Sequence, residues 1–285
     1  MSPSISLDIE RLGPVDMFDK YLDIKRNELG MWDPGQYRRF SAERARPFFD
    51  LLAQAQVTDP GLVADLGCGP GDLSVTLAER WPAATVIGVD NSAAMIEAAL
   101  GGPRAERLCF VLDDVRKWTP DRPADVIVSN AVLQWVPDHL EVLTRWAGML
   151  AEGGWLGIQV PGNFDQPSHA ILRELAGSPR WRPLLGGVRL NRQAADPDRY
   201  LDVLSAAGCT ATAWETTYFH VLHGDNPVVE WYKGTGLRPV LEALTPPLAD
   251  EFAAEYGAMI REAYPARPYG TVLPFRRVFA AAQRG

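Results

Sequence analysis

Through the middle of the chain, apolar runs of strand length alternate with stretches whose apolar positions recur every three or four residues. The apolar runs are "GLVADLG", "ATVIGVD", "RLCFVLDD", "ADVIVSN" and "GGWLGIQV". Continuously apolar strands separated by helices are typical of a parallel sheet that is covered on both faces. We therefore predict an α/β fold with a Rossmann-like sheet, whose ligands bind beyond the carboxyl ends of the strands.

The pattern changes after Val160. Residues 163–192 combine one helical segment with loops rich in proline and glycine, and residues 224–268 are mostly helical, so we expect these segments to form a helical cap. A helix ending near Gly208, a long strand "CTATAWETTYFHVL" and a closing strand "YGTVLPFRRVFAAAQ" complete the pattern. The predicted sheet then has seven strands, and its ligand-binding core is expected at about residues 60–162.

Residues 1–30 form a polar N-terminal extension, in which "VDMFDKYLDIKRNEL" predicts one amphipathic helix. Acidic residues stand where a signal peptide would carry positive charge, and no apolar run approaches the ~18 residues of a membrane span. We expect a cytoplasmic protein without a membrane partner.

The composition narrows the function classes. The chain has 285 residues, of which 47% are apolar, so it can bury a large core. A formal net charge of -8, without any run of lysines and arginines, disfavours nucleic acid as a partner. Three widely spaced cysteines without a histidine cluster predict neither a disulfide framework nor a metal site.

The first predicted strand ends in "DLGCGPGD", with glycines at alternate positions 67, 69 and 71. A dinucleotide-binding loop needs its third glycine at position 72, where this chain has Asp72, and a carboxylate there would face a pyrophosphate. Asp65 at the strand end attracts positive charge, while the glycines admit a close backbone approach. The loop therefore favours a cationic or zwitterionic ligand, and S-adenosylmethionine fits that description.

Polar residues also end the strands that follow. Asp90 ends the second strand, Asp113 and Asp114 follow the third, and Asn130 ends the fourth. An acid after the second strand can accept hydrogen bonds from ribose hydroxyls, and one after the third can accept from an adenine amine. Each residue alone is as readily explained as a helix cap or turn residue, but their recurrence at successive strand ends favours a ligand site.

These stretches, from "VADLGCGPGD" through "VIGVD" and "FVLDDV" to "VSNAVLQWVPDH", resemble the class I methyltransferases that use S-adenosylmethionine. The resemblance implies one methyltransferase domain over residues 31–285 and a sheet whose last strand runs antiparallel. It also implies cofactor-binding roles for Asp65, Gly67, Gly69, Gly71, Asp90, Asp114, Val115 and Asn130.

From about Trp32 to the C-terminus the chain is similar to a narrower group, the trans-aconitate methyltransferases. The similarity lies in "WDPGQYRRFSAERARPF", "LQWVPDH", "QVPGNFDQPSHAILRELA", "WETTYFHVL", "TGLRPVLEAL" and "LPFRRVFAAA". It implies methyl transfer to a carboxylate of a small polycarboxylic acid, which gives a monomethyl ester. A carboxylate with a pKa of about 4 is already ionised at neutral pH, so no catalytic base is expected.

A polycarboxylate site needs cationic clamps and walls that exclude water. The candidate residues for it are Arg44, Arg238 and Arg277 as clamps, with Tyr37, Phe40, Trp135, Tyr218 and His220 as walls or donors.

Each candidate also has a structural explanation. Arg44 can pair with Glu43, and Arg238 precedes a proline at an expected helix start. Trp135 and Tyr218 are of types that commonly fill a core. Two nearby histidines, at positions 220 and 223, have metal-pair spacing, but no third ligand is evident.

Three other functions stay open on the sequence alone. A hydroxyl, amine or carbon acceptor would need a base, for which His220 or His169 is available. A cofactor-binding protein without turnover would keep the same loop. A nicotinamide oxidoreductase is disfavoured by Asp72, and nothing in the sequence sets an oligomeric state.

Overall fold

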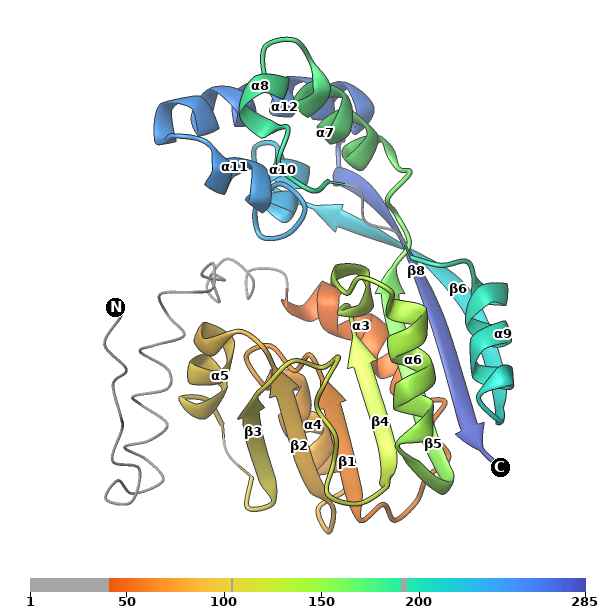
Figure 1. Ribbon diagram of the computed structural model, residues 1–285. Helices are drawn as coiled ribbons and strands as arrows, with labels where there is room; N and C mark the ends of the chain where they lie inside the picture. The colour runs from red at the N-terminus through yellow and green to blue at the C-terminus, as the bar shows by residue number, and fades with distance from the viewer. Residues whose placement is uncertain (1–40, 104, 191–193) are drawn as a thin grey trace, which may run out of the picture.

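The computed structural model describes residues 41–103, 105–190 and 194–285, with side chains from Ala45 onward. Figure 1 shows a sheet with helices on both faces and a second group of helices at the far end of two long strands. The helix predicted within residues 1–30 lies outside the described residues.

The strands belong to a single sheet in the order β3-β2-β1-β4-β5-β8-β6, and the short β7 pairs with β8. They are β1 (Leu62–Leu66), β2 (Thr85–Asp90), β3 (Leu108–Leu112), β4 (Ala124–Asn130), β5 (Leu150–Pro161), β6 (Cys209–Leu222), β7 (Ala266–Arg267) and β8 (Gly270–Arg284).

The strand directions confirm the predicted sheet. β1 to β5 pair in parallel, whereas β8 is antiparallel to both β5 and β6. The two-residue β7 is an addition that the hydrophobic pattern did not predict, because a pair of exposed residues has no periodicity to detect. The carboxyl ends of β1, β2 and β4 therefore meet along one edge, where the sequence places its polar residues.

Two clusters of buried side chains cover the faces of this sheet. Helices α6 (His139–Gly148) and α9 (Pro197–Ala206) pack their apolar sides on one face, with Trp146 fully buried. Helices α3 (Ser41–Leu52) and α4 (Asp72–Arg80) cover the other. Because the central strands lie between these layers, β1 is buried along its whole length, which explains its unbroken apolar run. Helix α5 (Ala93–Leu100) lies against β2 and β3.

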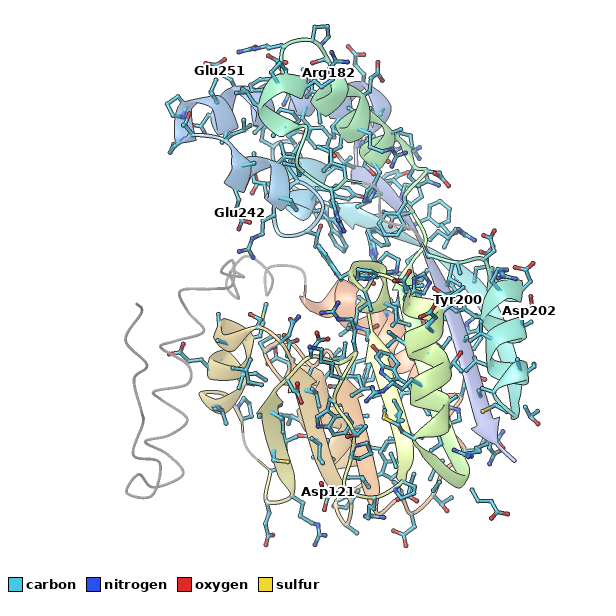
Figure 2. The ribbon with its side chains drawn as sticks, viewed as in Figure 1. Asp121, Arg182, Tyr200, Asp202, Glu242 and Glu251 are labelled. Atoms are coloured by element: carbon cyan, nitrogen blue, oxygen red, sulfur yellow. The ribbon has the colours of Figure 1, made fainter. Side chains whose placement is uncertain are left out.

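The remaining helices form a separate group, which we call the upper helices. They are α7 (Pro167–Gly177), α8 (Arg182–Leu185), α10 (Pro227–Lys233), α11 (Arg238–Ala243) and α12 (Pro246–Ala263). Their apolar sides, with Trp181, Trp231 and Phe252, form a third buried cluster that also includes Leu273 and Phe275 of β8. Figure 2 shows Arg182 and Glu251 on the outer side of this group. The upper helices occupy the segments in which a helical cap is predicted, and they rest on the extended ends of β6 and β8 (Figure 1).

Candidate functional site

The glycine loop between β1 and α4 has a backbone that only glycine adopts easily. Gly67, Gly69 and Gly71 have φ values of 83°, 56° and 84°, all in the left-handed region. A Cβ on Gly67 would lie 2.1 Å from Val132, and one on Gly71 would lie 2.6 Å from Phe110. A Cβ on Gly69 would meet no atom within 4 Å. Gly67 and Gly71 are therefore required by packing, whereas Gly69 borders open space.

Asp90 fixes the position of this loop from the end of β2. Its Oδ2 accepts a hydrogen bond of 2.9 Å from the N–H of Gly69, and its Oδ1 accepts one of 2.9 Å from the N–H of Ser92. Burial raises the pKa of Asp90, and these backbone hydrogen bonds offset part of that rise. Each carboxylate oxygen keeps a second lone pair with which it can accept from a ligand hydroxyl.

Asp65, the last residue but one of β1, is only 3% exposed. Ser74 Oγ on α4 donates a hydrogen bond of 2.6 Å to its Oδ2. Burial raises the pKa of Asp65 to about 6; the Ser74 hydrogen bond lowers it in part and the charge of Asp90 raises it further. One hydrogen bond offsets little of the cost of burying the charged form, so a cation bound nearby would stabilise the ionised Asp65.

Two adjoining cavities open at the glycine loop, and we call them together the loop cleft. One has a volume of about 620 Å³ and the other about 390 Å³. Both are lined by Gly67, Gly69, Pro70 and Asn130. The residues with predicted cofactor roles that line the cleft are Asp65, Gly67, Gly69, Asp90, Asp114, Val115 and Asn130.

Gly71 is the one member of that predicted set that lines neither cavity; it packs against Phe110 instead. The cleft fits an elongated zwitterion on two observations. Gly69 leaves room for a ligand atom where a side chain would project, and Asp65 lines the end of the cleft with a buried negative charge. The role of each residue toward the cofactor stays a prediction.

Asp114 is already engaged by a neighbouring arginine. Arg116 Nε donates to both of its carboxylate oxygens at 2.9 Å, and the N–H of Arg116 donates to Oδ1 at 2.9 Å. The Arg116 hydrogen bonds hold the pKa of Asp114 below its ordinary value. Any adenine amine at this end of the cleft would share an acceptor that Arg116 has oriented.

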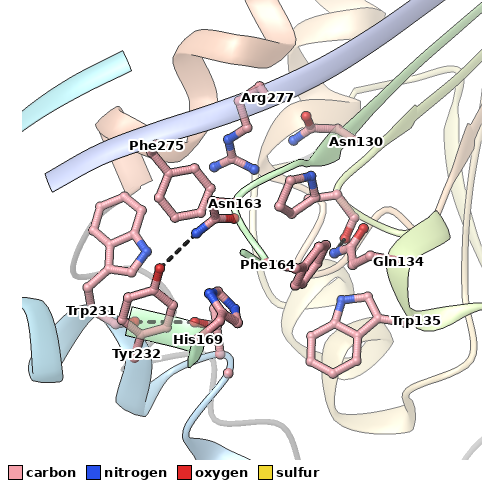
Figure 3. A pocket seen from close by; sticks show the side chains of 14 residues that line it. Asn130, Gln134, Trp135, Asn163, Phe164, His169, Trp231, Tyr232, Phe275 and Arg277 are labelled. Carbon is pink, nitrogen blue, oxygen red and sulfur yellow. Dashed lines mark hydrogen bonds between the residues drawn. The ribbon is translucent and has the colours of Figure 1, made fainter. Parts of the chain in front are cut away.

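A second pocket lies between the sheet edge and the upper helices, and we call it the Arg277 pocket. It is lined from β4, from η2 (Leu133–Trp135), from the loop after β5, and from α7, α10 and β8. Figure 3 shows Arg277 pointing into it from β8 and Trp135 lining the opposite side. Asn130 and Trp135 line both this pocket and the loop cleft, so the two spaces adjoin.

Arg277 is the buried cation of this pocket. It is 4% exposed, and its guanidinium lies 4.2 Å from the ring centroid of Phe275 on the same strand. Trp135 is 37% exposed and is thus accessible at the rim. The structure brings together two predicted substrate residues, Trp135 and Arg277, in a space that adjoins the loop cleft.

Tyr232 is the centre of a hydrogen-bonded group on the other side of the pocket. Its Oη accepts from Asn163 Nδ2 at 2.7 Å (Figure 3). It also accepts from Ser168 Oγ at 2.9 Å. Asn163 and Tyr232 are not among the site residues predicted from the sequence. Asn163 carries the same signal as Asn130, a polar side chain just beyond the end of a parallel strand, whereas Tyr232 lies on a helix and carries no such signal.

Other predicted substrate residues lie outside the pocket lining. Tyr218 Oη donates a hydrogen bond of 2.6 Å to Asp50 Oδ2, and its ring stacks on His220 at a centroid distance of 6.2 Å. His220 also stacks on Trp231 at 5.0 Å, and burial lowers its pKa to about 4. Arg238 Nε pairs with Glu242 Oε1 at 2.5 Å on α11.

Three predicted substrate residues fall on the part of the chain that the structure does not describe. Tyr37, Phe40 and the side chain of Arg44 lie there. In the described ranges, no three histidine, cysteine or acidic side chains are placed to hold a metal ion. Among the residues that the structure describes, every helix is too short or too polar for a membrane crossing.

Comparison with known proteins identifies the chain's relatives. A family model described as a methyltransferase domain matches residues 63–154. The trans-aconitate 2-methyltransferase of Streptomyces coelicolor is 54% identical over 262 residues, which cover 89% of this chain and 86% of that protein. The enzyme of the same name from Rhodococcus jostii is 50% identical over 89% of this chain and 99% of that protein. The one from Mycobacterium marinum is 42% identical, over 90% and 97% respectively.

Solved structures show the fold alone. The YcgJ protein from Bacillus subtilis has a TM-score of 0.55 at 13% identity, covering 84% of this chain and 98% of that one. The [4+2]-cyclase SpnF has a TM-score of 0.51 at 19% identity, covering 85% and 81%. The fold therefore hosts different chemistries, and the assignment rests on the relatives of high identity. By their identity and coverage, the chain belongs to the trans-aconitate 2-methyltransferase family.

Proposed function

We propose that the protein transfers a methyl group from S-adenosyl-L-methionine to a carboxylate of trans-aconitate and forms its monomethyl ester. The single observation that supports this best is the identity of 50–54% over 89% of the chain to relatives named trans-aconitate 2-methyltransferase. A buried arginine in a pocket that adjoins the loop cleft gives the proposal a physical basis.

Residues of the loop cleft would hold the methyl donor. Asp90 offers its remaining lone pairs to ribose hydroxyls, Gly69 allows a close backbone approach, and Asp65 attracts the cationic amino-acid end. When bound there, S-adenosyl-L-methionine supplies an electrophilic methyl group. Asn130, which lines both cavities of the cleft and the Arg277 pocket, lies where donor and acceptor would meet.

The Arg277 pocket would hold the acceptor. A guanidinium binds a carboxylate through two parallel hydrogen bonds, and burial strengthens that attraction. Because the acceptor carboxylate is ionised at neutral pH, the pocket needs to orient it and to exclude water but needs no base. Trp135 at the rim and Phe275 beneath Arg277 supply the apolar walls for that purpose.

Methyl transfer from labelled S-adenosyl-L-methionine to trans-aconitate tests the proposal. We expect a labelled product that alkali hydrolyses, formed in equal amount to S-adenosylhomocysteine. An alkali-stable product from a hydroxyl or amine acceptor would contradict it and favour the base-dependent alternative. Tight cofactor binding in calorimetry without turnover on any polycarboxylic acid would contradict it in favour of a binding protein.

A further inference from the structure

The hydroxyl of Tyr232 lies in the wall of the Arg277 pocket with its position fixed on every side. The side chain is 2% exposed, and its ring packs edge-to-face on His169 at a centroid distance of 5.0 Å. Figure 3 shows the hydroxyl pointing toward Asn163, beside Phe275 and on the side of the pocket from which Arg277 projects. Tyr232 thus cannot turn its hydroxyl away from the pocket without breaking this packing.

The directions of the hydrogen bonds define what Tyr232 can offer a ligand. Asn163 Nδ2 and Ser168 Oγ both donate to its oxygen. A phenolic hydroxyl has two acceptor lone pairs and one proton, so both lone pairs are used and the proton remains. With Ser168 as the donor, that proton makes no hydrogen bond to the described residues. An unused donor in so buried a place is unfavourable, and an acceptor on a ligand removes that cost.

The hydroxyl stays protonated at every working pH. Burial raises the pKa of Tyr232 above its ordinary value; the Ser168 and Asn163 hydrogen bonds and the charge of Arg277 offset only part of the rise. A neutral donor therefore stands in the same pocket as a permanent cation.

Two further tyrosines contact the backbone of Ser168 on the side away from the pocket. Tyr256 Oη donates to the carbonyl oxygen of Ser168 at 3.0 Å, and the N–H of Ser168 donates to Tyr264 Oη at 3.2 Å. Neither tyrosine lines the pocket. Both contact only the backbone of Ser168, whereas Tyr232 is contacted by the Ser168 hydroxyl, so the hydroxyls of Tyr256 and Tyr264 lie outside the set that orients the donor.

Buried acceptors in the same wall restrict where carboxylates can lie. Asn130 Oδ1, Gln134 Oε1 and Asn163 Oδ1 line the pocket and make no hydrogen bond to described residues. An amide oxygen disfavours a carboxylate beside it, so donors such as Arg277 and Tyr232 decide where the carboxylates of an acid are held.

We propose that Tyr232 donates a hydrogen bond to a second carboxylate of the acceptor, distinct from the one that Arg277 binds, and so selects tricarboxylic over dicarboxylic acids. This inference rests on the proposed function, because it concerns the acceptor of that reaction. Of three carboxylates, Arg277 holds one and Tyr232 another, and the third is left to face the loop cleft, which adjoins the pocket. A dicarboxylic acid cannot occupy all three positions.

The test compares trans-aconitate with fumarate, which has the same trans double bond but lacks one carboxymethyl group. The Tyr232→Phe variant removes only the hydroxyl. We expect its kcat/KM for trans-aconitate to fall by about 10- to 100-fold, the range for a hydrogen bond to a charged group, while the value for fumarate changes less than about threefold. For an acid that is not turned over, its inhibition constant replaces kcat/KM.

Tyr256→Phe is the matched control, because it removes a buried hydroxyl from the same group outside the pocket. We expect this variant to keep the wild-type preference between the two acids, and both variants to bind S-adenosyl-L-methionine as the wild type does. An equal loss on both acids in Tyr232→Phe would overturn the inference in favour of a structural role. An unchanged preference would overturn it as well.

Asn163→Asp keeps the inference testable if Tyr232→Phe does not fold. Aspartate cannot donate, so it accepts the Tyr232 proton and withdraws the donor from the pocket; the preference for trans-aconitate should then be lost, and its retention would contradict us. If the wild type methylates none of these acids, the proposed function fails instead. Calorimetric titration of the S-adenosylhomocysteine complex with tricarballylate then tests Tyr232 alone, since only a donor role predicts weaker binding in Tyr232→Phe.

Discussion

Two glycines of the loop after β1 share a left-handed backbone but differ in what surrounds them. An alanine Cβ at position 67 meets Val132, whereas one at position 69 meets nothing. Both changes carry the conformational cost of about 1–2 kcal/mol for a left-handed residue, and Gly67→Ala adds an overpacking cost of about 1–3 kcal/mol.

We expect Gly67→Ala to lower the free energy of unfolding by about 2–5 kcal/mol and Gly69→Ala by only about 1–2 kcal/mol. Gly69→Ala should instead weaken S-adenosyl-L-methionine binding, because its methyl group enters the loop cleft. Urea unfolding and calorimetry measure the two effects. Equal destabilisation with unchanged cofactor affinity in both variants would contradict this division of roles.

Asp65 predicts a pH dependence of cofactor affinity. Burial raises its pKa from 3.8 to about 6, so the free protein takes up a proton at this side chain as the pH falls through 6. A bound cation favours the ionised form and lowers this pKa. Affinity should therefore be constant above about pH 7 and weaken below about pH 6, by up to about tenfold for each pH unit.

Calorimetry between pH 5 and pH 8 checks this, with Asp65→Asn as the control whose affinity should be weaker and nearly independent of pH. The stability effect has the opposite direction. A raised pKa contributes stability that is fully present below 3.8 and lost as the pH rises through about 6, so Asp65→Asn should stabilise the free protein at pH 8 but not at pH 4. An Asp65→Asn variant that keeps the wild-type pH dependence would rule out Asp65 as its source.

At the level of single residues, the lining of the loop cleft could be predicted from the strand ends, whereas only Trp135 and Arg277 of the Arg277 pocket were predicted, through a family resemblance. Asp65, Asp90 and Asn130 stand at strand ends, and a parallel sheet brings strand ends together whatever the rest of the fold does. Arg277 and Tyr232 meet across more than forty residues of sequence, on a strand and a helix whose packing no local pattern reveals. Arg238 has the right chemistry but pairs with Glu242, away from the pocket.

Among the elements, β8 separates two adjacent arginines by its alternation. Arg277 points into the pocket, while Arg276 Nε donates to Glu215 Oε2 at 2.7 Å and its Nη1 donates to the carbonyl oxygen of Gly162 at 3.1 Å. Successive side chains of a strand point to opposite faces, so the pair provides an internal control.

We expect Arg277→Gln to lower kcat/KM for trans-aconitate by about 30- to 1,000-fold, because a buried charge-assisted carboxylate contact of about 2–4 kcal/mol is lost. Cofactor affinity should not change. Arg276→Gln should change kcat/KM by less than about threefold, since its partners are partly exposed. Steady-state kinetics at saturating S-adenosyl-L-methionine measures both, and similar losses in the two variants would refute the assignment of Arg277 to the acceptor.

The elements themselves were largely predictable. The buried strands β1 and β4 have unbroken apolar runs because helices cover both of their faces, and β6 alternates between exposed and buried residues near its C-terminal end because only one of its faces is covered there. The strand patterns also predicted β6 at its observed bounds and β8 to within one residue at each end. What they could not predict was the pairing of β6 with β8 and the packing of the upper helices on the ends of both strands, because these contacts join residues far apart in the sequence.

In the whole molecule, β6 and β8 connect the sheet core with the core of the upper helices. Phe279 of β8 belongs to a cluster of the sheet, and Leu273, six residues away on the same strand, belongs to the cluster of the upper helices. The two strands pair without interruption over fourteen residue pairs, from Cys209 with Arg284 to Leu222 with Thr271.

Separate unfolding of the upper helices would break that ladder, so we expect one cooperative transition. Tryptophan fluorescence and far-ultraviolet circular dichroism should give coincident urea curves, because tryptophans and helices lie in both cores, for example Trp146 on the sheet and Trp181 among the upper helices, and separate unfolding of either core would split the curves. Two resolved transitions would contradict this expectation. If amide hydrogen exchange were then slow only in the sheet, the upper helices would be an independent folding unit.

The register between β5 and β8 sets the distance between the Arg277 guanidinium and Asn130, and so the length of acid that the pocket accepts. Pro161 pairs with Arg277, and Gln159, which pairs with Asn130 on its other side, pairs with Phe279. Sliding β8 by one residue would turn Arg277 out of the pocket, so the span between the guanidinium and Asn130 can change only in two-residue steps of about 7 Å. No register of β8 therefore matches an acid that is one carbon longer or shorter. Relatives of this fold that accept such acids must change the side chain that reaches the substrate and keep the strand where it is.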